Sequence, residues 1–173
     1  IKAGTSSSSA SVVSWINFLN QMADEPFKST KKEIGDLAFK AEVIEFEEPG
    51  GMMDQYTTAL GNLVYLESEP IISVEKLNAP LGDFVLGDSC EQKDTFGILS
   101  RCRDTRLGIL KRIRSLNIGF SLQSCDFDLD LSVLAEDEKT LFKCTIENRN
   151  LLGEAKLELD KEELDHELSL IHI

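Results

Sequence analysis

Cysteine and histidine are scarce in this sequence, which has four cysteines and two histidines in 173 residues. The cysteines (Cys90, Cys102, Cys125 and Cys144) are widely spaced and form no Cys-x-x-Cys pair, and both histidines follow position 165. This spacing disfavours a zinc site and predicts reduced thiols in a cytoplasmic protein.

Long apolar runs are also lacking: no stretch approaches the roughly 18–20 residues that a membrane span requires. Basic residues are outnumbered, with 18 lysines and arginines against 31 acids and a formal net charge of −13. Such a field repels nucleic acids and anionic membranes, so we expect neither as a partner. An anionic nucleotide is still compatible, because backbone N–H groups and a divalent cation can override the net field at one site. The oligomeric state is left open.

The ends of the chain carry no initiator methionine, no signal-peptide pattern and a short apolar tail at positions 170–173. We expect a fragment of a longer protein, whose last few residues need not be native. Its length suits one domain, or one domain with part of another.

Hydrophobic spacing predicts three helical segments in the first 60 residues. The first begins at the serine run Ser6–Ser9 and ends near Met22, and positions 52–60 are expected to form a turn that leads into the third. The second is capped by Ser29 or Thr30 and ends at positions 47–51. Its expected apolar face comprises Ile34, Leu37, Ala38, Ala41 and Ile44.

Short β-rich runs follow at positions 62–67, 71–75 and 83–88 and predict neighbouring strands. A long helix capped by Asp94 or Thr95 comes next, and an amphipathic segment covers positions 141–152. The residues expected to face inward on the long helix are Phe96, Leu99, Cys102, Leu107, Leu110 and Ile113. Helices combined with a short run of strands indicate an α+β fold.

The run Gly4-Thr5-Ser6-Ser7-Ser8-Ser9-Ala10 is a candidate phosphate site. Glycine and small hydroxylated residues at a helix start let backbone N–H groups approach phosphate oxygens, and the helix dipole adds attraction. A serine hydroxyl one turn in can ligate Mg²⁺. The run is not a Walker A loop, since it has no Gly-Lys-Ser/Thr. The alternative is a serine-rich linker or an ordinary helix cap.

Two motifs in order resemble the GHMP kinases, a superfamily that includes galactokinase, homoserine kinase, mevalonate kinase and phosphomevalonate kinase. The serine run is similar to their Gly-Leu-Gly/Ser-Ser-Ser-Ala loop, with Thr5 in place of leucine and one additional serine. Ala41-Glu42-Val43 and Gly51-Met52-Met53-Asp54-Gln55 resemble the Ala-Glu-His and Gly-Ile-Met-Asp-Gln motifs of galactokinases, with the same separation between Glu42 and Asp54.

The resemblance implies that Gly4, Ser6, Ser7, Ser8 and Ser9 contact ATP. It further implies that Glu42 and one serine ligate Mg²⁺; that serine is Ser8 when counted from Gly4 and Ser9 when counted back from Ala10. Asp54 then corresponds to the catalytic residue that accepts or orients the proton of the attacking sugar hydroxyl. Phosphoryl transfer depends mainly on such positioning and charge neutralisation.

Each role has a structural alternative. Glu42 lies in an acidic run that is typical of a solvated helix face, and Asp54 follows two glycines where an aspartate often caps a helix. The arginines Arg101, Arg103 and Arg106 are equally typical of an exposed helix face. Val43 replaces the histidine of galactokinases, and neither the first nor the third motif of the family is present.

The expected fold is therefore the two-layer N-terminal domain of GHMP kinases, which is ribosomal S5 domain 2-like. It would occupy residues 1–118, and the start of a C-terminal α+β domain would occupy residues 119–173, with truncation at both ends. The leading functional hypothesis is an ATP-dependent sugar 1-kinase acting on galactose or a related sugar, the fragment alone being inactive. Alternatives are another GHMP kinase (of the heptose, arabinose, uronic acid or mevalonate type) and a non-catalytic sugar and ATP sensor.

Overall fold

The computed structural model of the chain describes residues 6–69, 71–78, 82, 83, 85, 87, 95–126 and 128–159. The chain divides into two compact units, Ile1–Leu99 and Ser100–Ile173. Helices predominate, and a sheet of two strands is present among the described residues. The α+β class is thus confirmed, whereas the domain boundary expected after residue 118 stays a prediction.

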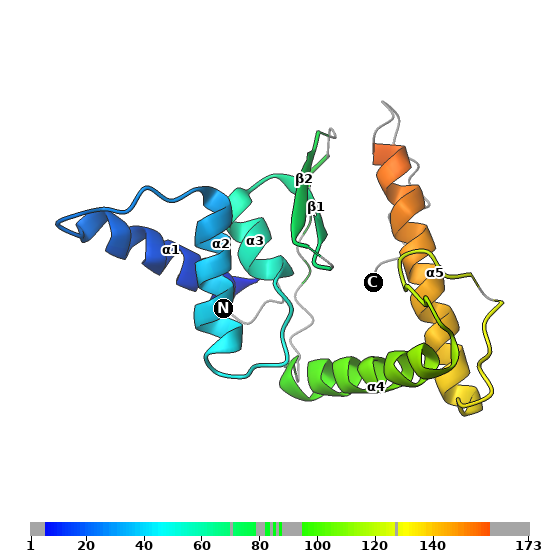
Figure 1. Cartoon of the computed structure of the whole chain (residues 1–173). Helices are drawn as coiled ribbons and strands as arrows, with labels where there is room; N and C mark the ends of the chain where they lie inside the picture. Colours follow the sequence, from blue (N-terminus) through cyan, green and yellow to red (C-terminus); the bar gives the residue numbers. More distant parts are fainter. Residues whose placement is uncertain are drawn as a thin grey trace. The chain divides into compact units, whose positions relative to one another are not determined.

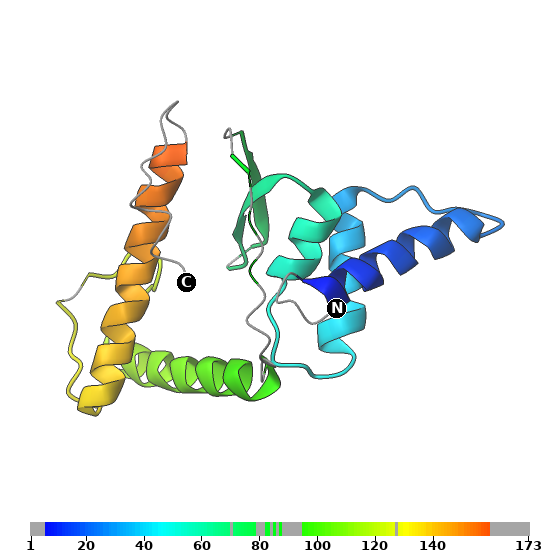
Figure 2. The same cartoon turned by 180° about the vertical axis from the view of Figure 1, so that it is seen from behind.

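Helix α1 (Ser7–Met22) opens the first unit, in agreement with the predicted helix. Its first half packs on the two following helices, and its second half extends beyond them (Figures 1 and 2). Val13 is therefore buried, whereas Trp15 is 59% exposed and Leu19 50% exposed. The rings of Trp15 and Phe18 stack on each other with centroids 5.3 Å apart. The apolar pattern marks the helix correctly, although only its early turns contribute to the core.

Helix α2 (Lys31–Phe39) begins at a capping box. The Thr30 hydroxyl accepts the backbone N–H of Glu33 at 3.2 Å, and the Glu33 carboxylate accepts the backbone N–H of Thr30 at 2.7 Å. These reciprocal bonds satisfy donors that a helix start otherwise leaves unpaired. Of the two predicted caps, Thr30 is the one used.

The last turn of this helical segment is a π-helix, η1 (Lys40–Ile44). Its wider turns show in the bonds from the Glu45 N–H to the Lys40 carbonyl and from the Glu48 N–H to the Val43 carbonyl, both 2.9 Å. One additional residue per turn moves the buried position from the expected Ala41 to Val43. The predicted apolar face is consequently wrong beyond Ala38, and Ile44 is 57% exposed. It is also wrong at Leu37, which is 42% exposed.

Helix α3 (Met53–Leu60) packs closely against α2. A Cβ built on Gly35 would lie 3.3 Å from Cα of Tyr56, so the two backbones approach each other at this glycine. Tyr56 is fully buried, and its hydroxyl donates to the Asp36 carboxylate. Burial, together with the Asp36 carboxylate, raises the pKa of Tyr56. A small core of Val13, Ile34 and Ala38 joins α1 to α2.

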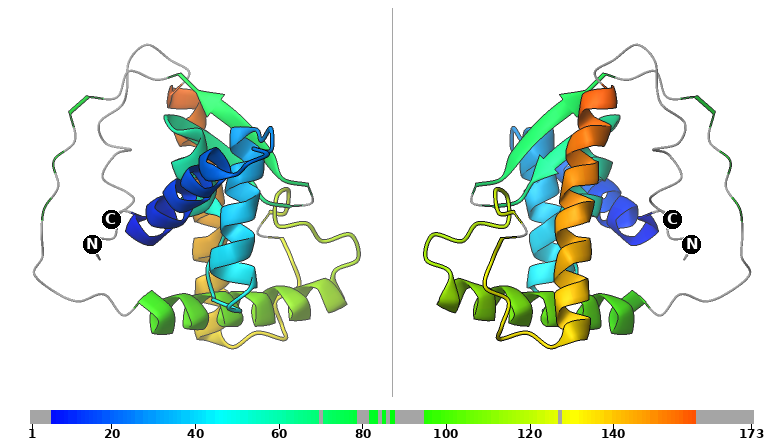
Figure 3. Two further views of the ribbon diagram at one scale, coloured as in Figure 1. Left: turned by 90° about the vertical axis from the view of Figure 1, so that its left-hand side faces the viewer. Right: turned by 90° about the vertical axis from the view of Figure 1, so that its right-hand side faces the viewer.

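Strands β1 (Leu63–Glu67) and β2 (Ser73–Leu77) form an antiparallel pair, visible as the green arrows in Figure 3. Leu63 lies opposite Leu77 and Glu67 opposite Ser73. The first strand matches its prediction closely, and the second begins two residues later than predicted. The third predicted strand, at 83–88, lies partly outside the described residues, and its described residues Asp83, Val85 and Gly87 are not in a strand.

The second unit is built on α4 (Thr95–Leu116), which begins in the first unit, and on α5 (Glu136–Leu159). The first turns of α5 cross the second half of α4 (Figure 3). Their core comprises Ile109, Ile113, Leu134, Phe142 and Ile146. The expectation that Leu99 and Leu107 face inward is wrong, since they are 38% and 57% exposed, and Ile109 is buried instead. The side chain of Phe96 lies outside what the structure describes.

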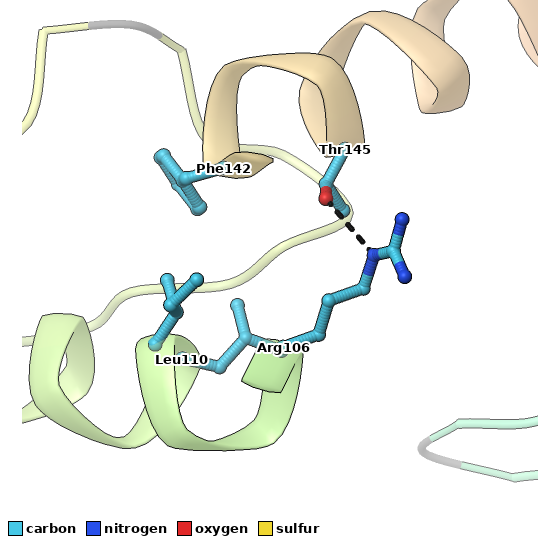
Figure 4. A pocket seen from close by; sticks show the side chains of 5 residues that line it. Arg106, Leu110, Phe142 and Thr145 are labelled. Carbon is cyan, nitrogen blue, oxygen red and sulfur yellow. Dashed lines mark hydrogen bonds between the residues drawn. The ribbon is translucent and has the colours of Figure 1, made fainter. Parts of the chain in front are cut away.

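Within the second unit, Arg106 is half-buried and its Nε lies 3.4 Å from the Thr145 hydroxyl oxygen (Figure 4). The adjoining cavity, bordered by Leu110 and Phe142, measures about 10 Å³ and suits a single water at most. Arg101 and Arg103 are exposed, as expected for a solvated helix face. The described cysteines Cys102, Cys125 and Cys144 are free thiols. In the part of the chain that the structure describes, every helix is too short or too polar to cross a membrane.

Candidate functional site

The serine run forms the turn that leads into α1. Ser6 adopts the left-handed conformation, with φ 53° and ψ 33°, and its side chain makes no capping hydrogen bond. A left-handed residue directly before right-handed helical residues aims successive N–H groups into one concavity, which attracts anions. The first turn of α1 contains no acidic side chain to compensate the positive end of its dipole. Gly4 lies outside the described residues.

The next two serines differ in environment. Ser8 is exposed, whereas Ser9 is 2% exposed and donates its hydroxyl hydrogen to Oε2 of Glu42 at 2.8 Å. These neighbours are the two positions that motif alignment leaves open for a metal-binding serine. The geometry gives them distinct surroundings, since the Ser9 hydroxyl is directed at the carboxylate and Ser8 lies at the surface.

Glu42 reaches the serine run from the π-helical segment η1. It is half-buried and accepts hydrogen bonds from Ser9 and from Nε2 of Gln55 on the same oxygen, Oε2. Burial raises the pKa of the Glu42 carboxyl, but hydrogen bonds from Ser8, Gln55 and Ser9 outweigh that effect and hold it below its ordinary value. The carboxylate is therefore ionised at neutral pH. It is not a freely solvated side chain of an acidic run.

Asp54 is the second residue of α3 and is exposed. The cap of this helix is Met52, which makes no side-chain capping bond, so the alternative of Asp54 as the helix cap is wrong. The next residue, Gln55, is 3% exposed and donates from Nε2 to Oε2 of Glu42 at 2.7 Å. Its carbonyl oxygen Oε1 is buried and has no hydrogen-bond partner.

These segments border one pocket of about 570 Å³. Among its lining residues are the predicted Ser8, Ser9, Glu42 and Asp54, together with Val43, Glu48, Pro49, Gly50, Gly51, Met53 and Gln55. The predicted Ser6 and Ser7 are not among the residues that line it. The pocket thus collects side chains from the start of α1, from η1 and from the start of α3.

Gln55 belongs to one of the two motifs, but the motif implies no role for it. The available signal is helical spacing: Gln55 directly precedes Tyr56, and with Leu60 these residues form the buried face of α3. A polar side chain on a buried helix face needs a partner. Glu42 is that partner.

Few side chains at this pocket could coordinate a metal ion. In the described part of the chain, no group of three or more histidine, cysteine or acidic side chains is placed to hold a metal ion. The donors present are hard oxygens, namely the Ser8 hydroxyl and the carboxylates of Glu42 and Asp54. This set fits a cation that takes most of its ligands from phosphates and water, which is how Mg²⁺ is usually bound in nucleotide sites.

Comparison with protein families gives one match: residues 1–62 match the family model described as the GHMP kinases N terminal domain. The matched range contains every residue predicted for the site and supports a relation to the GHMP superfamily for this part of the chain. A comparison with curated proteins finds no match, and one with solved structures finds none either.

Proposed function

We propose that this chain carries the nucleotide and metal site of an ATP-dependent small-molecule kinase of the GHMP superfamily. The observation that supports this most strongly is the convergence of Ser8, Glu42 and Asp54 on one pocket. These residues come from separate segments of the first unit, and each belongs to a motif that resembles the superfamily. At about 570 Å³ the pocket falls within the range of small-molecule sites, about 300–1,000 Å³.

Phosphate binding is assigned to the start of α1. The backbone N–H groups after the left-handed Ser6 and the positive end of the helix dipole attract the phosphates of ATP. Gly4, Ser6 and Ser7 belong to this loop in the proposal, together with the hydroxyls of Ser8 and Ser9. A local array of N–H donors accounts for nucleotide binding in a chain of net charge −13.

Glu42 and Ser8 are the proposed protein ligands of Mg²⁺. Ser8 is preferred over Ser9 because Ser8 is exposed at the pocket, whereas Ser9 is only 2% exposed. When bound, the cation neutralises charge on the phosphates that is otherwise unfavourable in phosphoryl transfer. The ionised Glu42 carboxylate, held by hydrogen bonds on Oε2, stays fixed in orientation at the wall of the pocket.

Asp54 is the proposed catalytic residue for the acceptor hydroxyl. It lies exposed in the first turn of α3, at the border of the pocket. The carboxylate accepts a hydrogen bond from the attacking hydroxyl and so orients its oxygen. It takes up the proton as that oxygen bonds to the γ-phosphorus and the bond from phosphorus to the departing ADP breaks. The acceptor is a small alcohol that fits beside Gly50 and Gly51.

The finer proposal is a sugar 1-kinase acting on galactose or a related sugar, on a ribosomal S5 domain 2-like fold in a cytoplasmic protein. It is supported by the Gly51-Met52-Met53-Asp54-Gln55 sequence, in which Asp54 and Gln55 now share a pocket with the serine run. Acceptors of the heptose, arabinose, uronic acid and mevalonate type are the alternatives within the same chemistry.

The test is an ATP-dependent phosphorylation assay with the natural protein that carries these residues, using a panel of these acceptors. We expect transfer of the γ-phosphoryl group to at least one acceptor, and loss of about 100-fold or more in kcat for Asp54→Asn. ATP binding without transfer to any acceptor would favour the sensor alternative. Transfer at an undiminished rate by Asp54→Asn would remove the assigned role of this aspartate.

A further inference from the structure

Gln55 is the most heavily buried polar side chain at the proposed site apart from Ser9. Its amide nitrogen is paired with Glu42, yet its carbonyl oxygen is buried without a partner. Buried polar atoms are nearly always hydrogen-bonded, and an unpaired one destabilises the fold. Stability of the fold therefore does not account for a glutamine at this buried position.

Glu42 determines how this amide is oriented. An ionised carboxylate only accepts hydrogen bonds, so Gln55 must present its NH₂ group to Oε2 and direct its carbonyl elsewhere. The opposite orientation would place two acceptors against each other. The unpaired Oε1 is thus the consequence of a bond that holds the carboxylate.

The hydrogen bond from Gln55 restrains one oxygen of the Glu42 carboxylate, Oε2. Ser9 and Gln55 both donate to Oε2, so neither occupies Oε1 of Glu42. Two donors on Oε2 restrain the plane of the carboxylate, and the Ser8 hydroxyl, which also contacts this carboxylate, lies beside it at the pocket, where a cation would bind. Partners of metal ligands commonly act in this way, and their loss weakens metal binding.

Gln55 also follows Asp54 directly along α3. A hydrogen bond from Gln55 to Glu42 therefore ties the start of α3, which carries Asp54, to the segment η1, which carries Glu42. The distance between the proposed metal ligand and the proposed catalytic aspartate then depends on this contact. A shift of η1 or of the start of α3 would therefore change the distance between the carboxylates of Glu42 and Asp54.

We propose that Gln55 is a positioning residue, which orients the Glu42 carboxylate for a divalent cation and sets its spacing from Asp54. This inference rests on the proposed function, because it presupposes a cation bound at Glu42. It adds a residue for which the motifs imply no role.

The experiment compares binding of AMP-PNP, a non-hydrolysable ATP analogue, by calorimetry in Mn²⁺ and in EDTA. In Gln55→Met the apolar side chain keeps the length of glutamine, but it can neither donate to Glu42 nor leave a buried carbonyl unpaired. We expect Gln55→Met to weaken binding in Mn²⁺ about 10-fold or more and to leave binding in EDTA within about twofold of the wild type. Its Tm without metal should equal or exceed that of the wild type.

Thr58→Val, also on α3, is the matched control and should alter neither affinity. Equal Mn²⁺ enhancement in Gln55→Met and in the wild type would overturn the inference, as would equal weakening in Mn²⁺ and in EDTA, which indicates a merely structural role. If Gln55→Met does not fold, Gln55→Asn replaces it, because its amide falls one methylene short of Glu42 and the same outcomes apply.

The two proposals fail in different ways. A wild-type chain that binds no AMP-PNP overturns the proposed function and this inference together. A wild type that binds equally with and without Mn²⁺ overturns the metal role of Glu42 and hence of Gln55, but leaves nucleotide binding in place. A wild type with Mn²⁺ enhancement that Gln55→Met retains overturns only the role of Gln55.

Discussion

Replacing Gly35 by alanine should destabilise the first unit, although the same change in an open helix is stabilising. The new Cβ would meet Tyr56 at 3.3 Å from Cα and 3.4 Å from Cγ, and Ala59 at 3.6 Å from Cβ. A backbone atom cannot rotate away, so α2 and α3 must separate. Alanine gains about 1 kcal/mol in helix propensity over glycine, and overpacking costs about 1–3 kcal/mol. The expected net loss is about 0–2 kcal/mol.

Gly108→Ala in α4 supplies the control, since a Cβ at Gly108 would meet nothing within 4 Å. Only the propensity gain of about 1 kcal/mol applies there. Urea unfolding measures both variants, with fluorescence of Trp15, the only tryptophan in the chain, reporting the first unit and circular dichroism reporting the helices. Equal stabilisation by both substitutions would refute the close approach of α2 and α3.

Separation of α2 and α3 in Gly35→Ala should also alter the geometry of the proposed site. Glu42 follows α2 in the same helical segment, and Gln55 belongs to α3, so Gly35→Ala is expected to lengthen their 2.7 Å hydrogen bond. The Mn²⁺ enhancement of AMP-PNP binding should then fall in Gly35→Ala and stay unchanged in Gly108→Ala. An unchanged Mn²⁺ enhancement in both variants would contradict this expectation, because it would show that the packing of α2 against α3 does not affect the geometry of the site.

Three further perturbations follow from the structure. Thr30→Ala removes the capping box and should cost about 1 kcal/mol in urea unfolding. The backbone N–H and the hydroxyl of Thr30 lower the pKa of Glu33, so their stabilisation is present above pH 4.5 and is lost as the pH falls through the lowered pKa. A pH series should show a smaller loss in Thr30→Ala than in the wild type, because alanine keeps the backbone N–H and lacks the hydroxyl. Phe142→Ala empties a fully packed position between α4 and α5 and should cost about 3–5 kcal/mol, measured by circular dichroism during urea unfolding; a cost below about 1 kcal/mol would contradict the assigned core.

Local signals in the sequence are enough to predict most elements of the first unit. Helix starts lie close to three such signals. These signals are the serine run before α1, the Thr30 and Glu33 pair at α2, and the glycines at 50 and 51 before α3. The α+β class follows from the same reasoning. Motif spacing also anticipated the meeting of Ser8, Glu42 and Asp54 at one pocket.

The π-helical segment is what sequence reasoning could not supply. Apolar residues at Ala38, Ala41 and Ile44 fit ordinary helical spacing, so nothing in the pattern indicates that the turn widens after Phe39. Widening depends on bonds such as that from the Glu48 N–H to the Val43 carbonyl, which form only in the folded chain. The widened segment carries Glu42, and its carboxylate lies within hydrogen-bond distance of Ser9 and Gln55. π-Helical turns are frequent at functional sites.

The role of Gln55 was hidden for a related reason. Its motif neighbour Asp54 is exposed and has an evident chemical use, whereas Gln55 is buried and acts only through Glu42. The separation of these residues along the chain gives no indication of a contact, which requires η1 and α3 to be packed together. Tertiary contacts of this kind become visible only in the structure.

The most direct test of the whole account is an amide NMR spectrum of the labelled chain with AMP-PNP, recorded with Mg²⁺ and then with trace Mn²⁺. The paramagnetic ion broadens signals of nearby residues. We predict selective broadening at Ser8, Ser9, Glu42, Asp54 and Gln55. Broadening centred elsewhere, or none at these residues, would contradict a nucleotide-bound cation in this pocket.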